Sequence, residues 1–104
     1  MLGAIVGDII GSRFEGRKPD SLDFELFTAE SCFSDDTVLT LAVAKWLLDD
    51  PNHTHVGIIK SLRTVGWHHL GAGYGQMFYC WLRGSNPEPY GAWSNGSAMR
   101  VSPI

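Results

Sequence analysis

Cysteine, positive charge and long apolar runs are all scarce in this 104-residue sequence. The two cysteines, Cys32 and Cys80, stand far apart, so we expect free core thiols in a reducing, cytoplasmic compartment rather than a disulfide framework. The eight lysines and arginines are scattered and the net charge is -3, which argues against nucleic acid as a main partner. The apolar opening MLGAIVGDIIG contains Asp8, lacks a basic start and is too short to cross a bilayer, so we expect neither a membrane span nor a signal peptide.

Strand-type alternation, internal repeats and low-complexity tracts are absent as well. Hydrophobic residues make up 44% of the chain and aromatic residues 12%, which is enough apolar material for one core. We therefore predict a single all-α domain over residues 1–104. Its helices are expected at about 2–12, 34–48, 55–69 and 76–82, with SNGSAMRV at 94–101 as a loop that enters a further helix.

The first predicted helix carries Gly3, Gly7 and Gly11 at one spacing, which places them on one face. Each glycine destabilises a helix by about 1 kcal/mol relative to alanine, so the presence of three on one face indicates a structural or functional role. Tight packing against another helix is favoured over a ligand contact, and a strand stays the alternative for this segment. The second predicted helix is apolar nearly all round, which is typical of a central, buried helix. Thr54 is expected to cap the third.

Two adjacent carboxylates, Asp35 and Asp36, stand at the start of the most apolar helix. One interpretation is capping, because Ser34 is a good N-cap and acidic residues in a first turn contribute about 0.3–1 kcal/mol each. The other is a metal site, because no lysine or arginine lies within five residues and buried carboxylates are costly without a partner. Carboxylates and a hydroxyl suit Mg²⁺ or Mn²⁺. The residues alone favour capping over a metal.

Two glycine-containing loops, GAGYGQ at 71–76 and SNGSAM at 94–99, each precede a predicted helix. Exposed backbone amides at helix starts attract phosphates, so the two loops near a carboxylate pair indicate a diphosphate ligand next to a metal. Neither loop fits the strand–glycine loop–helix fingerprints of nucleotide-binding proteins. Asp8, inside an apolar helix, is expected to be a hydrogen-bonding structural residue rather than a catalyst.

The sequences of four segments, and their order along the chain, resemble the ADP-ribosylglycohydrolases, which include the enzymes that reactivate dinitrogenase reductase and the J1 crystallins. These segments are GAIVGDIIGSRFEG at 3–16, FSDDTVLTLAVA at 33–44, GAGYG at 71–75 and SNGSAMRVSPI at 94–104. The Ser-Asp-Asp-Thr and Asn-Gly-Ser-x-Met-Arg motifs, found together, are quite specific.

The resemblance implies an all-helical fold around two Mg²⁺ ions, with Mn²⁺ in some members. By it, Ser34, Asp35 and Asp36 supply the first set of metal ligands, and Thr37 completes the motif as a cap. Glu15 matches an acidic residue near the scissile ribose, so the catalytic set implied is Glu15 with both aspartates. The loops around ADP-ribose are implied to be formed by Gly73, Tyr74, Gly75, Asn95, Gly96, Ser97 and Met99.

The implied activity is Mg²⁺-dependent hydrolysis of the glycosidic bond that links ADP-ribose to an acceptor. The partner is then an ADP-ribosylated protein or an ADP-ribose derivative, and the acceptor (arginine, serine, O-acetyl-ADP-ribose or polymer) is left open. The family's second metal-ligand motif has no match in residues 1–104. We therefore expect the N-terminal portion of such an enzyme, completed by a C-terminal portion or by self-association, and its activity alone stays open. The alternatives are a non-catalytic ADP-ribose-binding or crystallin-like relative and a Mg²⁺-dependent nucleotide phosphohydrolase.

Overall fold

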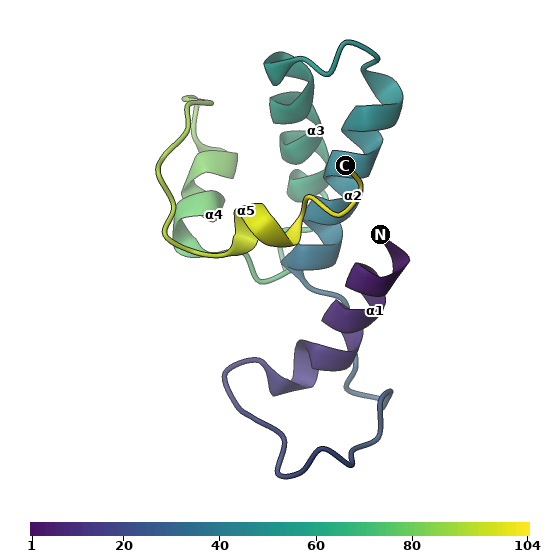
Figure 1. Ribbon diagram of the computed structural model, residues 1–104. Helices are drawn as coiled ribbons and strands as arrows, with labels where there is room; N and C mark the ends of the chain where they lie inside the picture. Colours follow the sequence, from purple (N-terminus) through teal and green to yellow (C-terminus); the bar gives the residue numbers. More distant parts are fainter.

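Five α-helices and one short 3-10 turn, with no strand, make up the computed structural model, which describes residues 1–104 (Figure 1). The elements are α1 (Leu2–Gly11), η1 (Ser12–Phe14), α2 (Asp35–Asp49), α3 (His55–Trp67), α4 (Gln76–Arg83) and α5 (Gly96–Met99). The predicted all-α class is confirmed, and the first segment is a helix rather than a strand. None of the helices is both long and apolar enough to cross a bilayer.

Helices α2 and α3 form an antiparallel hairpin at the centre of the molecule (Figure 1). The turn between them is held by Asp50, which accepts hydrogen bonds from the backbone N–H and the hydroxyl of Thr54 at 2.9 and 2.6 Å. Thr54 is the N-cap of α3, as predicted, and accepts from the Gly57 N–H at 3.0 Å. Further along, the buried Ser61 hydroxyl donates to the Ala42 carbonyl at 2.6 Å, so the two helices are joined by polar as well as apolar contacts.

The core is small and lies where α4 meets the hairpin. Leu39 of α2 packs with Phe78 and Leu82 of α4, and Leu62, Tyr74, Trp81 and Tyr90 lie around them. Helix α2 contributes most of the buried residues, including Thr40, which donates to the Asp36 carbonyl at 2.7 Å. The expectation that α2 is buried all round is only partly right, because Leu41 and Leu48 are 45% and 83% exposed. Its neighbours α1, α3, α4 and α5 leave these two side chains largely uncovered.

Two other expectations about burial are wrong. Both cysteines are exposed, because Cys32 lies in the extended segment before α2 and Cys80 is on the outer side of α4. No heavy atom lies within 4 Å of where a side chain would begin at Gly3, Gly7 or Gly11, so no helix packs closely on that face of α1. The face of α1 that meets α2 is the one that carries Asp8.

Candidate functional site

The side chain of Asp8 joins α1 to the start of α2. It accepts four hydrogen bonds, from the backbone N–H groups of Ser34 and Thr37 at 2.8 and 3.2 Å and from their hydroxyls at 2.5 and 2.6 Å. Burial alone would raise the pKa of Asp8, but these hydrogen bonds outweigh it and leave the pKa lowered. Asp8 is therefore ionised and structural, as its place in an apolar helix predicted.

The extended conformation of Ser34 places it at the N-cap of α2, directly before the two aspartates. Its φ and ψ are -123° and -167°, and its side chain accepts from the Asp36 N–H at 3.4 Å. Asp35 and Asp36 occupy the first turn of α2 and are both half-buried. The capping interpretation of this segment is thus confirmed for Ser34, while the two carboxylates remain available for another role.

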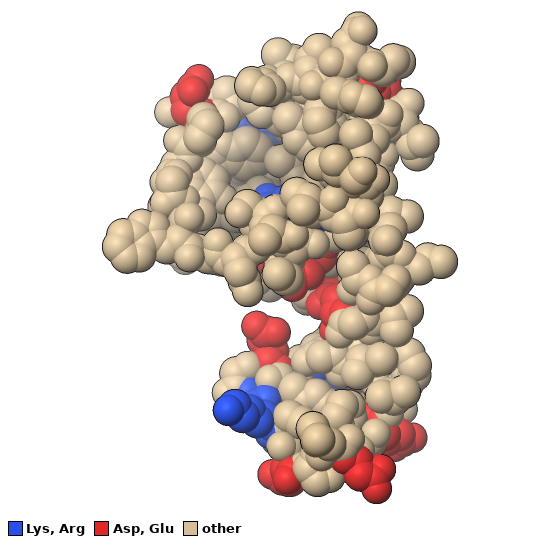
Figure 2. All heavy atoms as spheres, viewed as in Figure 1, with Lys and Arg blue, Asp and Glu red and all other residues tan.

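Asp35 and Asp36 lie in a strongly negative environment. Burial raises the pKa of Asp35 most, and the charges of Asp36, Asp8 and Glu15 raise it further. Burial likewise raises the pKa of Asp36, with Asp8 and Glu15 adding to it and Arg100 opposing them. Figure 2 shows acidic side chains gathered at the waist of the molecule, where α1 and the loop after it meet the helical body. Four carboxylates from three chain segments therefore face one region.

The glycine-rich loop at 71–75 is attached directly to the aspartate pair. The backbone N–H of Asp35 donates to the Ala72 carbonyl at 2.9 Å. Gly73 has a φ of +95°, a conformation that favours glycine, and Gly75 is the N-cap of α4. The hydroxyl of Tyr74 donates to the Gly66 carbonyl at 2.9 Å and its ring packs against Phe78, so this side chain anchors the loop to α3.

The second loop reaches the same region through Arg100. The Arg100 Nε donates to the Gly96 carbonyl at 2.7 Å, which closes α5, and the guanidinium lies over the Phe78 ring at 5.5 Å from its centroid. Arg100 is the one basic residue whose charge lowers the pKa of Asp36. The other predicted residues of this loop lie at the surface: Asn95, Ser97 and Met99 are exposed, and Gly96 is half-buried.

These oxygens suit a hard divalent cation. The carboxylates of Asp35 and Asp36 make no ion pair, and the one ion pair of the structure lies at the other end of α2. Carboxylate and hydroxyl oxygens are the donors that Mg²⁺ and Mn²⁺ prefer. No group of three or more histidine, cysteine, aspartate or glutamate side chains is arranged to hold a metal by itself. By chemical type, therefore, the oxygens of Ser34, Asp35 and Asp36 are donors that such a cation accepts.

A model of the family described as ADP-ribosylglycohydrolase matches residues 1–104. The chain belongs to the ADP-ribosylglycohydrolase family. No solved structure matches the chain. The match covers all four segments that carry the resemblance, from GAIVGDIIGSRFEG to SNGSAMRVSPI.

In this ADP-ribosylglycohydrolase chain, segments that are far apart in the sequence meet at the N-terminal end of α2. Glu15, Asp35 and Asp36 are near enough for their charges to interact. The loop of Gly73, Tyr74 and Gly75 is tied to them by one backbone hydrogen bond. The side chains of Asn95, Ser97 and Met99 form no hydrogen bond or ion pair with the aspartates, and Ser97 instead lines an apolar hollow between α5 and the α2–α3 hairpin.

Sequence reasoning did not select Arg100 as a site residue. Its only sequence signal was its place at the end of the Asn-Gly-Ser-x-Met-Arg motif. Its effect on Asp36 depends on how the C-terminal segment folds back onto α2, and residue spacing does not predict that.

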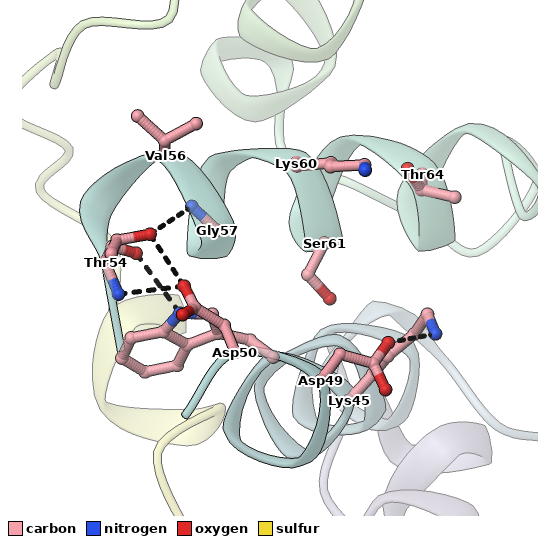
Figure 3. A pocket seen from close by; sticks show the side chains of 10 residues that line it. Lys45, Asp49, Asp50, Thr54, Val56, Gly57, Lys60, Ser61 and Thr64 are labelled. Carbon is pink, nitrogen blue, oxygen red and sulfur yellow. Dashed lines mark hydrogen bonds and ion pairs between the residues drawn. The ribbon is translucent and has the colours of Figure 1, made fainter. Parts of the chain in front are cut away.

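A polar groove at the far end of the α2–α3 hairpin is not part of this site (Figure 3). Its charged and polar groups mostly bond to one another: Asp50 accepts a hydrogen bond from Thr54, and Lys45 forms an ion pair with Asp49 (Figure 3). None of the predicted site residues lines it.

Proposed function

We propose that this chain provides the first metal-ligand set and the substrate loops of an enzyme that hydrolyses the glycosidic bond between ADP-ribose and an acceptor, in the presence of Mg²⁺. The observation that carries the proposal is the hydrogen bond from the Asp35 N–H to the Ala72 carbonyl, which joins the aspartate pair to the loop at 71–75, on a side of the molecule where the charge of Glu15 also acts on both aspartates. Family membership supports a glycohydrolase in general.

The reaction replaces the bond from the ribose anomeric carbon to the acceptor with a bond to a water oxygen. One proton leaves the water and one proton reaches the departing acceptor, so the products are ADP-ribose and the free acceptor. Positive charge develops on the ribose ring in the transition state. A carboxylate near the anomeric carbon stabilises that charge, and Glu15 is the proposed catalytic carboxylate that is not assigned to the metal.

Each carboxylate has a role that its position supports. Ser34, Asp35 and Asp36 would hold Mg²⁺, or Mn²⁺, which when bound polarises water and orients the ribose hydroxyls. Glu15 is exposed, directly after η1, and free to orient a water molecule and accept its proton. The following Gly16 has a φ of +75°, so the chain turns directly after Glu15.

The two glycine-containing loops are proposed to bind the diphosphate of ADP-ribose. Gly73 and Gly75 carry no side chain that would cover the backbone at the start of α4, which is eight residues long. Asn95 is the N-cap of α5, which begins at Gly96, and Arg100 at the end of this helix lies over the Phe78 ring of α4. Binding energy from the diphosphate would hold the reacting bond in place.

The test is release of free ADP-ribose, measured by chromatography, from ADP-ribosyl-arginine and ADP-ribosyl-serine peptides and from O-acetyl-ADP-ribose. For the intact protein, in which both metal-ligand sets are present, we expect release in Mg²⁺, loss of release in EDTA, and loss of release in Asp35→Asn. The matched control is Asp23→Asn, which makes the same chemical change at an exposed loop position and should leave the rate unchanged. Full activity of Asp35→Asn, or of the wild type in EDTA, would contradict the metal role.

The same assay separates the two alternatives. Inorganic phosphate or AMP as the product, in place of intact ADP-ribose, would identify a phosphohydrolase. Binding of ADP-ribose by calorimetry without turnover of any of the substrates would identify a non-catalytic relative.

A further inference from the structure

We propose that Asp8 is a positioning residue for the metal site. Asp8 accepts the hydrogen bond that the Ser34 hydroxyl donates, and this orientation leaves an oxygen lone pair of Ser34 for the cation. The inference rests on the proposed function, because it concerns the metal site formed by Ser34, Asp35 and Asp36. It assigns Asp8 more than the structural role of joining α1 to α2.

The argument begins with the proton of the Ser34 hydroxyl. A serine hydroxyl has one proton to donate and two lone pairs with which to accept. The Ser34 oxygen lies 2.5 Å from Asp8 Oδ1, and an ionised carboxylate can only accept, so the proton points toward Asp8. The Asp36 N–H reaches the same oxygen at 3.4 Å and engages at most one lone pair. The other lone pair remains for a cation.

Helix capping alone does not need this arrangement. Ser34 already occupies the N-cap of α2, and one acceptor is enough to satisfy a first-turn N–H. Asp8 instead comes from another helix, 26 residues earlier, and binds both the N–H and the hydroxyl of Ser34. It is itself fixed by the N–H and hydroxyl of Thr37, so its carboxylate has little freedom to rotate away.

The charge of Asp8 supports the same role. Its negative charge disfavours the ionised forms of Asp35 and Asp36 and so raises the pKa of both. A divalent cation at these carboxylates would turn that repulsion into attraction. Carboxylates that hydrogen-bond to metal ligands typically change metal affinity by about 10–100-fold when they are replaced.

The test is the affinity of the full chain for Mn²⁺ alone, measured from free Mn²⁺ by electron paramagnetic resonance. We expect Asp8→Asn to weaken binding about 10-fold or more, because the amide oxygen can accept but the amide NH₂ must donate into the same group of hydroxyls. The matched control is Asp50→Asn, which also removes a carboxylate that accepts from a threonine N–H and hydroxyl, at the other end of α2. We expect both variants to lower the unfolding temperature and only Asp8→Asn to weaken Mn²⁺ binding.

A double-mutant cycle tests whether Asp8 acts through Ser34. If it does, Asp8→Asn should weaken Mn²⁺ binding much less in a Ser34→Ala background than in the wild type, because the hydroxyl that Asp8 orients is absent there. Additive losses would overturn the positioning role. If Asp8→Asn fails to fold, Asp8→Glu replaces it: an affinity below that of the wild type supports the inference and an unchanged affinity overturns it.

Asp35→Asn distinguishes failure of this inference from failure of the proposed function. If the wild type does not bind Mn²⁺, or Asp35→Asn binds it equally well, the proposed metal site falls and this inference falls with it. If Asp35→Asn loses binding but Asp8→Asn keeps the wild-type affinity, only the role of Asp8 is overturned.

Discussion

The backbone N–H of Asp35 donates to the carbonyl of Ala72 at 2.9 Å, so the first turn of α2 and the glycine-rich loop are one structural unit. The loop is held from its other side by Tyr74, whose hydroxyl donates to the Gly66 carbonyl on α3. A substitution that loosens the loop should therefore shift the aspartates, and a substitution at the aspartates should shift the loop.

Tyr74→Phe should destabilise the fold by about 0.5–1.5 kcal/mol, because it removes the hydrogen bond to Gly66 while the ring keeps its contact with Phe78. Chemical denaturation followed by circular dichroism measures the change. Tyr79→Phe is the matched control, since the Tyr79 hydroxyl only accepts a long hydrogen bond from Arg83 at the surface. Equal stability of Tyr74→Phe and the wild type would show that the loop is not anchored in this way.

Alkaline pH should unfold the chain as Tyr74 ionises. Burial first, and the charge of Asp35 second, raise the pKa of Tyr74 to about 12. The neutral phenol is the form that the fold favours, so its contribution to stability is complete below the usual tyrosine pKa of about 10 and is lost as pH rises from there toward 12.

Absorbance of tyrosinate, followed together with circular dichroism, checks this order of events. Of the three tyrosines, Tyr74 should ionise last or only with unfolding. In Tyr74→Phe the late ionisation step should be missing. Ionisation of all three near pH 10 in a chain that stays helical would contradict the burial of this hydroxyl.

Acid should remove the contribution of Asp50 to the turn between α2 and α3. The hydroxyl and N–H of Thr54 are the largest causes that lower the pKa of Asp50. Stability from this carboxylate is therefore present above its unfolded pKa and is lost as pH falls through the lower, folded pKa. Asp50→Asn should be less stable than the wild type at pH 7, and the difference should shrink as pH falls below the ordinary aspartate pKa of about 3.9. Thermal unfolding at the two pH values measures it, with Asp23→Asn as the exposed control.

Gly57→Ala should destabilise the hairpin although alanine is the better helix former by about 1 kcal/mol. The new methyl group would collide with Asp50 Oδ2 and lie 3.0 Å from Trp46 Cδ1, and that carboxylate oxygen is held by Thr54. The matched control is Gly7→Ala in α1, where the methyl group meets no atom within 4 Å and should stabilise the helix. Changes in unfolding temperature of opposite sign for the two variants would confirm both environments. A lower unfolding temperature in Gly7→Ala would mean that another part of the molecule packs on that face.

Local signals predicted the helices well because their determinants are local. Ser34 and Thr54 cap the helices they precede by accepting from N–H groups two and three residues ahead, and such contacts depend only on nearby sequence. The predicted ends differ from the observed ones by one or two residues, as at the end of α3 near Trp67. The burial of these helices was predicted less well, since Leu48 of the apolar α2 is mostly exposed.

The sequence by itself determined the helical class, the helix starts and the family, because caps, apolar spacing and motif order are all properties of short segments. Only the tertiary structure decided which segments meet. Asp8 binds Ser34 across 26 residues, Asp35 binds Ala72, and Arg100 lies near enough to act on Asp36. Contacts of this kind depend on the packing of whole helices against each other, and residue spacing contains no measure of that packing.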